Sequence, residues 1–278
     1  MKKAIYILLA SVPLFFACSK KKEAAWSSPR REAMHWFEKQ KEYPEGSREE
    51  QYYLQKSIDA DPTYAAAWME KSVAHNRRGE FAKGFELLNE AVRLAPLEYL
   101  GDRAYVKYTM LHDYEGALED LVLLDSMTPD FTDAVWGKDI HHAIGIIHMQ
   151  LGNYKKALAS FDRSINGIVA SRGEEWVDVK TFFYRGVVKM ELNKYASSIR
   201  DFDKSIYYFE KFTEAHFYKG KVLLILNQPQ SACHHFRKAK KYFEEGYLYK
   251  NYYYEAPHQV YMSDIDEALC GCKEVAER

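Results

Sequence analysis

The sequence predicts an all-α protein, a solenoid of about six helix pairs closed by a C-terminal capping helix. Five segments share one residue pattern, which is the first observation. Within them, apolar residues recur three and four positions apart, as they do along one face of a helix. The repeats also begin about every 34 residues, a period typical of stacked helix pairs. The five segments are 78–92, 111–125, 151–165, 192–206 and 226–240.

The second helix of each predicted pair carries a small column of residues followed, four positions later, by a bulky one. Small residues let a neighbouring helix approach closely, and bulky residues fill the space between helices. In the first helices, Gly145, Gly186 and Gly220 align, with Ser72 and Tyr105 in the same column. The small column is Gly84, Ala117, Ala157, Ser198 and Ala232, and the bulky column is Leu88, Leu121, Phe161, Phe202 and Phe236.

This pattern resembles the tetratricopeptide repeat (TPR) family, whose signature places aromatic, small, bulky and proline residues at the same spacings. The resemblance implies a right-handed superhelix over residues 31–245, with repeats starting near 31, 65, 98, 138, 179 and 213. The first repeat is degenerate around 42–47, and Tyr105 and Pro229 depart from the family pattern. Residues 167–176 form an insertion that lengthens a helix or loop between repeats four and five.

The end of the chain, residues 246–278, is predicted to cap the last repeat, because an open helical stack exposes its core at each end. A segment dense in tyrosine, 247–261, precedes the predicted final helix. These tyrosines either cover the core of the last repeat or form a binding patch, since each combines apolar area with a polar group.

Residues 1–17 read as an export signal, because two lysines precede an apolar run too short to span a membrane. Ala17 stands directly before Cys18, which resembles a bacterial lipoprotein signal, although Phe15 occupies a position where leucine is usual. The resemblance implies cleavage before Cys18 and lipid attachment to its sulfur. The alternative is an ordinary signal peptide with a chance cysteine.

Residues 18–30 are polar and basic and are interpreted as a lipidated tether. Ser19 follows the cysteine, which by resemblance to known sorting rules favours the outer membrane over the inner one. The acidic run that often marks surface-exported lipoproteins does not follow Cys18. We therefore expect an outer-membrane lipoprotein that faces the periplasm rather than the cell surface.

No motif for catalysis, cofactor binding or metal binding emerges from the sequence, so we expect a protein that is not an enzyme. It has no glycine-rich phosphate loop and no nucleophile elbow. The histidine pairs 141–142 and 234–235 are adjacent, so their side chains point to different sides of a helix. A net charge of −1 also argues against a nucleic-acid partner.

Three cysteines remain after Cys18, namely Cys233, Cys270 and Cys272. An oxidising compartment permits a disulfide from Cys233 to either of the other two, which would leave one thiol free. Three reduced thiols are the alternative.

The TPR resemblance also implies a concave groove lined by the first helix of each repeat. Methionine and phenylalanine at these positions favour an adaptable apolar trough for a helix or an extended peptide. The alternatives are that the C-terminal segment folds back into this groove, or that the array curves so that these residues touch one another. The predicted groove residues are Met69, Val73, Arg77, Asp102, Val106, Met110, His142, Ile146, Met149, Lys180, Phe183, Val187, Met190, Phe217, Lys221 and Leu224.

These features together predict a membrane-anchored adaptor that binds a protein or peptide segment as part of a bacterial cell-envelope assembly. The alternative function is a cell-surface lipoprotein that binds glycan or another nutrient for an uptake complex, with tyrosines stacking on sugar rings.

Overall fold

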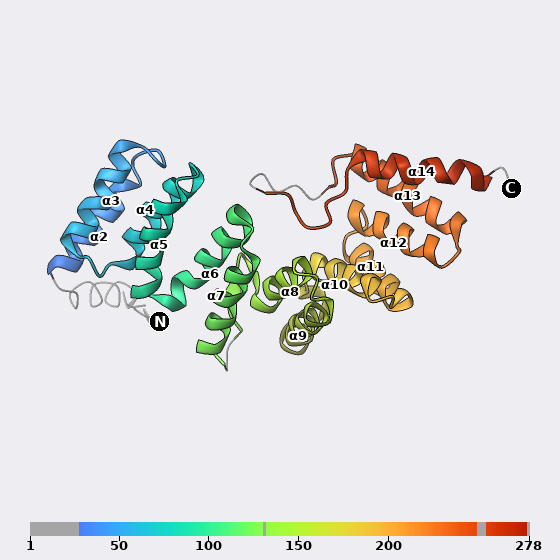
Figure 1. Cartoon of the computed structure of the whole chain (residues 1–278), viewed down its shortest axis with the longest axis horizontal. Coiled ribbons are helices and arrows are strands. Elements are labelled where there is room, and N and C mark those ends of the chain that lie inside the picture. The colour runs from blue at the N-terminus through green and yellow to red at the C-terminus, as the bar shows by residue number, and fades with distance from the viewer. Residues whose placement is uncertain (1–27, 130–131, 249–253, 277–278) are drawn as a thin grey trace, which may run out of the picture. The chain divides into compact units, whose positions relative to one another are not determined.

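A computed structural model describes residues 28–129, 132–248 and 254–276, so the predicted signal, Cys18 and most of the tether lie outside it. The chain divides into two compact units, residues 1–99 and 100–278, and each is considered by itself. Helices dominate both units (Figure 1), which confirms the all-α prediction. Within the described residues, no helix combines the length and apolar character needed to cross a bilayer.

The first unit contains two helix pairs. The degenerate first repeat is a complete pair of helices, and Ser47 caps the start of its second helix. The Ser47 hydroxyl accepts a hydrogen bond from the Glu50 amide at 3.1 Å, and the Glu50 carboxylate accepts one from the Gly46 amide at 2.6 Å. The helices are α2 (Ser28–Gln40), α3 (Arg48–Ala60), α4 (Ala65–Arg77) and α5 (Phe81–Leu94).

The second unit contains four further pairs, a short β-hairpin and a final helix. The hairpin pairs Ala134 with Asp139 and Val135 with Lys138, and it lies between the third and fourth repeats. The elements are α6 (Pro96–Val106), η1 (Lys107–Leu111), α7 (Tyr114–Met127), β1 (Ala134–Val135), β2 (Lys138–Asp139), α8 (Ile140–Gln150), α9 (Tyr154–Arg172), η2 (Glu174–Trp176), α10 (Val179–Glu191), α11 (Tyr195–Tyr208), α12 (Thr213–Ile225), α13 (Pro229–Glu244) and α14 (Met262–Ala276).

Glycine and phenylalanine form the predicted close contact between the two helices of repeats four, five and six. A methyl group added at Gly145, Gly186 or Gly220 would lie 2.5–2.7 Å from the phenylalanine ring of the paired helix, which is too close for real atoms. The three rings belong to Phe161, Phe202 and Phe236, and all are fully buried. Glycine is therefore required in this column so that the aromatic ring can pack against the backbone.

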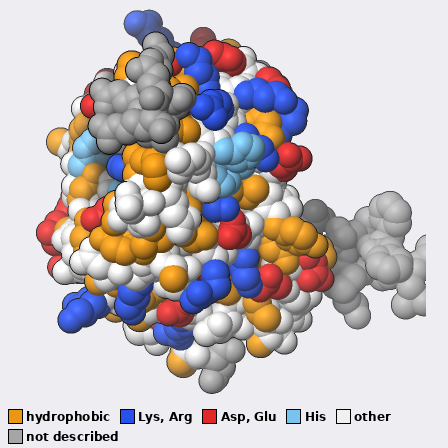
Figure 2. Space-filling view, turned by 90° about the vertical axis from the view of Figure 1, so that its right-hand side faces the viewer, with side chains coloured by type: hydrophobic (Ala, Val, Ile, Leu, Met, Phe, Trp, Pro, Cys, Tyr) orange, Lys and Arg blue, Asp and Glu red, His pale blue; other side chains and the backbone are white. Residues whose placement is uncertain are grey.

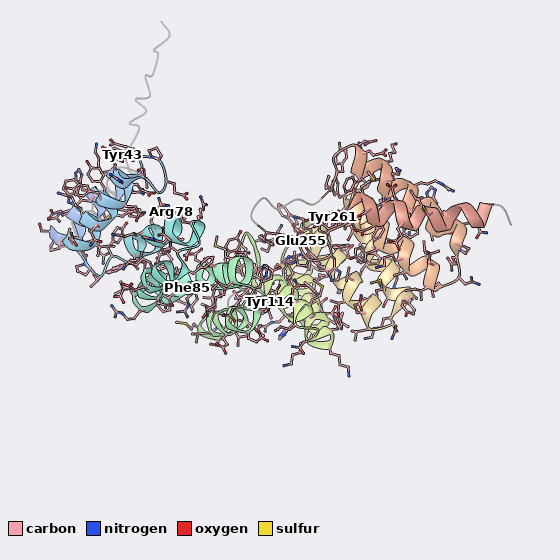
Figure 3. All side chains as sticks on the ribbon, turned by 45° about the horizontal axis from the view of Figure 1, so that its top comes forward. Tyr43, Arg78, Phe85, Tyr114, Glu255 and Tyr261 are labelled. Carbon is pink, nitrogen blue, oxygen red and sulfur yellow. A yellow bond between two sulfur atoms is a disulfide. The ribbon has the colours of Figure 1, made fainter. Side chains whose placement is uncertain are left out.

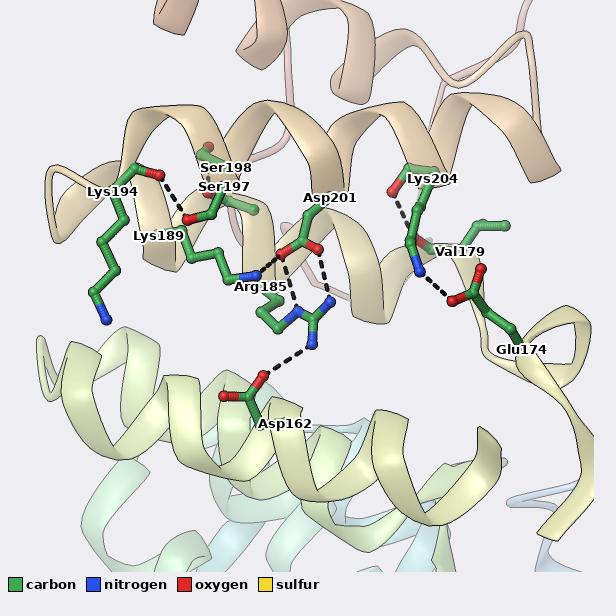
Figure 4. A network of polar contacts seen from close by, with 12 residues as sticks. Asp162, Glu174, Val179, Arg185, Lys189, Lys194, Ser197, Ser198, Asp201 and Lys204 are labelled. Carbon is green, nitrogen blue, oxygen red and sulfur yellow. Dashed lines mark hydrogen bonds and ion pairs between the residues drawn. The ribbon is translucent and has the colours of Figure 1, made fainter. Parts of the chain in front are cut away.

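A polar network fastens neighbouring helices in the second unit (Figure 4). The Arg185 guanidinium of α10 donates to both carboxylate oxygens of Asp201 in α11, at 2.7 and 2.9 Å, and to Asp162 in α9 at 2.9 Å. Lys189, one turn further along α10, pairs with Asp201 at 2.7 Å. Because Asp201 is buried, these charge-assisted bonds also satisfy its carboxylate.

The C-terminal helix α14 packs along α13 (Figure 1), as expected of a cap. Ile265 of α14 is fully buried. Lys240 of α13 forms an ion pair with Asp266 of α14 at 2.7 Å. Between α13 and α14, residues 254–261 run without helix or strand, and we name this segment the strap.

Candidate functional site

In the first unit, three predicted groove residues lie on α4. Met69 and Val73 are partly exposed, and Arg77 is exposed and forms an ion pair with Glu45 at 2.5 Å. This side of α4 is therefore accessible to a partner, with an apolar centre and a charged pair beside it.

In the second unit, the strap contacts the first helices of the repeats. The Tyr254 ring lies 6.4 Å from the Tyr105 ring and 5.8 Å from the Tyr108 ring, both edge-on. Further along the strap, the His258 ring packs edge-on against Tyr218 of α12 with centroids 5.6 Å apart. The strap therefore touches the third repeat with one residue and the sixth with another.

The strap also buries apolar groups of its own. Ala256, Pro257 and Val260 are all buried. Its far end is joined to the start of α14, since the Tyr261 backbone N–H donates to the Asp264 carboxylate at 2.9 Å. Within the strap, the Tyr261 hydroxyl donates to Glu255 at 2.7 Å, and the two side chains meet there (Figure 3). The alternative left open by the sequence, a C-terminal segment folded back onto the repeats, is the arrangement that the structure contains.

The predicted groove in this unit is consequently not an open apolar trough. Phe183 is 2% exposed because its ring packs against Phe212 at 5.2 Å and Tyr218 at 5.5 Å, which come from the next repeat. Lys180 is partly exposed, whereas Lys221 and Leu224 are exposed. The predicted groove residues that the structure buries are Val106, His142, Ile146, Met149, Phe183, Val187, Met190 and Phe217.

The third repeat requires a correction of register. Residues Lys107–Leu111 form a π-helix, which inserts one extra residue between the close-contact column and the following turn. Ala104, fully buried and directly after Arg103, therefore takes the position that the sequence alignment gave to Tyr105. The same shift is visible in the ion pairs, because Arg103 binds Asp120 as Arg185, directly before Gly186, binds Asp201.

This shift changes which side chains of the third repeat face the strap. Asp102, Val106 and Met110 were predicted as groove residues from an uninterrupted α-helix, and the structure instead brings Tyr105 and Tyr108 against Tyr254. Val106 is buried. The aromatic character of positions 105 and 108 was visible in the sequence, but their orientation depends on the π-helix.

Trp136 completes an aromatic cluster beside these tyrosines. It lies at the tip of the β-hairpin, its ring stacks on Tyr108 with centroids 5.3 Å apart, and its indole N–H donates to the Gly101 carbonyl at 2.9 Å. The cluster of Tyr105, Tyr108, Trp136 and Tyr254 therefore joins the hairpin, the third repeat and the strap.

The family models for the tetratricopeptide repeat match residues 51–98 and 139–166. Both matches fall on helix pairs with the geometry described above. The chain therefore contains tetratricopeptide repeats in these two stretches. No protein with a curated function matches the sequence significantly.

Solved structures with the same fold include three informative TPR neighbours. MamA from Desulfovibrio magneticus RS-1 aligns at 17% identity with a TM-score of 0.55, over 65% of this chain and 96% of MamA. PilW, described as a widely conserved type IV pilus biogenesis factor, aligns at 16% identity with a TM-score of 0.56, over 78% and 92% of the two chains. YrrB, a TPR protein with an unusual peptide-binding site, aligns at 14% identity with a TM-score of 0.53, over 69% and 93%. These likenesses concern the TPR fold alone.

The last repeat and the cap contain one disulfide and one free cysteine. Cys233 of α13 and Cys272 of α14 form a disulfide with a Cα–Cα distance of 5.7 Å. Cys270 is free and exposed. The sequence allowed Cys233 to pair with either Cys270 or Cys272, and the structure contains the pair with Cys272.

Histidines cluster in the TPR helices of the second unit, but their surroundings favour packing over catalysis. His142 is buried with its Nδ1 2.8 Å from the Thr181 hydroxyl, and burial lowers its pKa to about 4. His216 and His235 place their Nδ1 atoms 2.9 Å apart, and burial lowers the pKa of both. Among the described residues, no three His, Cys, Asp or Glu side chains converge to hold a metal ion.

Proposed function

We propose that this chain is a non-enzymatic TPR adaptor, anchored to the bacterial outer membrane by lipid on Cys18, that docks a protein or peptide segment on its concave side. The observation that carries the proposal is the strap. One non-helical segment already lies against the first helices of the repeats through ring contacts and the hydrogen bond between Tyr218 and His258.

The strap defines what kind of partner such a surface fits. Its contacts with the repeats use aromatic rings at Tyr254 and His258, four positions apart, and no strand pairing. A partner with the same chemistry is a turn-containing segment that carries two aromatic or histidine side chains at that spacing, with small apolar residues between them. The neighbour with a peptide-binding site supports a peptide ligand for this fold.

The anchor gives the adaptor its location. With the tether of residues 18–30, the repeats remain near the membrane, where confinement raises the effective concentration of any partner on the same surface. The pilus biogenesis factor among the TPR neighbours supports an envelope assembly as the setting. We propose the periplasmic face of the outer membrane.

Photo-crosslinking in cells tests the docking proposal. A photoreactive phenylalanine is placed at Leu224, which is 45% exposed, and separately at Val122 on the second helix of the third repeat, which is 51% exposed. One dominant envelope protein crosslinked from Leu224 but not from Val122, with a lower yield in Lys221→Glu, supports docking on the concave side. Lipidated protein that gives no protein adduct from Leu224 contradicts it.

The alternative function, capture of glycan or nutrient at the cell surface, predicts a different accessibility. Labelling of intact cells with a membrane-impermeant reagent modifies a surface-exposed chain and spares a periplasmic one. Strong labelling of this chain would therefore favour the capture function, and protection would favour the adaptor.

A further inference from the structure

A pocket of about 370 Å³ lies at the edge of the array, between the β-hairpin, the C-terminal half of α9 and the first turns of α8 and α10. Two walls come from segments that an ordinary repeat does not contain. One is the hairpin, and the other is the extension of α9 to 19 residues followed by η2. The insertions that interrupt the repeat spacing therefore build the pocket.

The lining includes a buried hydroxyl without a partner. Ser164 is fully buried and its Oγ makes no hydrogen bond with any described residue. In two other repeats the serine of the same column is satisfied, since Ser57 donates to the Ala33 carbonyl at 2.7 Å and Ser205 to the Val179 carbonyl at 3.0 Å. A buried hydroxyl left unpaired is unfavourable unless a ligand or water satisfies it, so Ser164 marks a binding position.

Space and an aromatic surface are both available beside Ser164. Gly167 lies within α9, where glycine disfavours helix, and a methyl group added there would meet no atom within 4 Å. At the rim, the Trp176 side chain is 65% exposed. An exposed indole beside a polar pocket offers a flat apolar surface against which a ring can pack.

The charges of the lining favour a ligand that is polar but neutral. Lys138 is paired with Asp178, and Asp139 and Asp178 accept the backbone N–H groups that begin α8 and α10, at 2.8 and 2.9 Å. Arg172 makes no hydrogen bond or ion pair with any residue in the described part of the chain, so it offers free donors. A ligand with hydroxyl groups can accept from Arg172 and donate to the carboxylates.

We propose that this pocket binds a neutral sugar unit of a glycan. The indole of Trp176 packs against the C–H face of the sugar ring, and the Ser164 hydroxyl forms a hydrogen bond with a hydroxyl group of the sugar. Lys138 and Arg172 offset most of the charge of Asp133, Asp139 and Asp178 in the lining, so the pocket has little net charge to attract a Lys or Arg side chain of a protein partner. The site shares only His142 with the predicted groove residues, and it does not depend on peptide docking.

Saturation-transfer NMR and calorimetry on the full chain test the site, with maltose, cellobiose and N,N′-diacetylchitobiose as probes. We expect millimolar binding of at least one disaccharide, weakened at least about tenfold in Trp176→Ala. Gly167→Phe should abolish binding, because its ring extends into the pocket. Ala170→Phe, on the same helix outside the lining, should leave binding unchanged, and circular dichroism checks that all three variants fold.

Two results would overturn the assignment. One is absence of transfer from all three disaccharides to the wild-type chain, or transfer that Trp176→Ala and Gly167→Phe do not change. The other is binding of a Gly-Lys-Gly peptide, and of no sugar, that the same two variants abolish, since this would assign the pocket to a protein side chain. Crosslinking from Leu224 should be unaffected in Gly167→Phe, which separates this site from the docking proposal.

Discussion

The hydroxyl of Tyr218 lies 3.1 Å from Nδ1 of His258, although the two residues are 40 positions apart in the sequence. Burial raises the pKa of Tyr218, and burial together with Lys221 lowers the pKa of His258 to about 4. At neutral pH both side chains are therefore uncharged, and the tyrosine hydroxyl and the imidazole nitrogen share a hydrogen bond. This bond holds the strap against the last repeat.

Acidification should destabilise the second unit. The pKa of His258, His142 and His216 is lowered by burial to about 4, compared with an ordinary value of 6.5. Because the neutral forms are favoured in the fold, their contribution is complete above about pH 6.5 and is lost as the pH falls through about 4. Each histidine should add up to about 1.4 kcal/mol per pH unit to the slope of the free energy of unfolding within that window.

Denaturant unfolding at a series of pH values checks this prediction. The His258→Gln variant is the control, because glutamine keeps an amide group but does not titrate, and its slope should be shallower than that of the wild-type protein. A free energy of unfolding that is constant between about pH 6.5 and 4 would contradict the prediction.

Substitution of two glycines by alanine should change the stability of the fold in opposite directions. In Gly186→Ala the new methyl group meets the Phe202 ring at 2.7 Å, so the helices must separate, and we expect a loss of about 1–3 kcal/mol. In Gly167→Ala the methyl group meets nothing, and the better helix propensity should raise stability by up to about 1 kcal/mol. Chemical denaturation of both variants measures the difference, and equal effects would show that the close contact is not rigid.

The fold could be predicted from the sequence because its determinants are local and repeated. Gly186 and Phe202 occupy the same columns in three repeats, and each contact forms between helices adjacent in the chain. The exception is the third repeat. There the π-helix adds one residue inside a helix, and neither hydrophobicity nor spacing distinguishes Tyr105 from Ala104 until the backbone path is known.

The site was predicted less well because its determinants are far apart in the sequence. Phe183 was expected to line an open groove, but Tyr218 of the next repeat covers it, and the strap lies on Tyr218 in turn. The pocket at the edge was missed altogether. Its only signal was the insertion around Trp176, and the sequence gives no indication that this loop meets the hairpin.

The two carboxylates bound to Arg185 should differ greatly in importance. Asp201 has a side chain 2% exposed and also holds Lys189, whereas the side chain of Asp162 is 44% exposed. Asp201→Ala leaves buried positive charge uncompensated and should cost about 3–5 kcal/mol. Asp162→Ala removes a solvated ion pair and should cost less than about 1 kcal/mol. Thermal and chemical unfolding of both variants measures the two losses of unfolding free energy. Similar losses would show that Asp162 and Asp201 contribute equally to stability.

Reduction of the Cys233–Cys272 disulfide should loosen the cap and then the strap. The bridge closes a segment of 39 residues that contains the whole strap, so removing it restores freedom to the unfolded chain and should cost about 2–4 kcal/mol. Cys233→Ala should show this loss, whereas Cys270→Ala should not, because Cys270 is exposed and unpaired. Thiol titration under denaturing conditions establishes the bond, and unfolding of each variant measures its effect.

The functional consequence can be read in the same variants. If the bridge keeps the strap on the repeats, Cys233→Ala should increase both proteolysis within residues 254–261 and crosslinking of a partner from Leu224. Ile265 and the Lys240–Asp266 ion pair still hold α14 in that variant, so the effect should be an increase in rate rather than loss of the fold. Proteolysis and crosslinking that match those of Cys270→Ala would show that the strap stays in place without the disulfide, and that a partner must displace it by affinity alone.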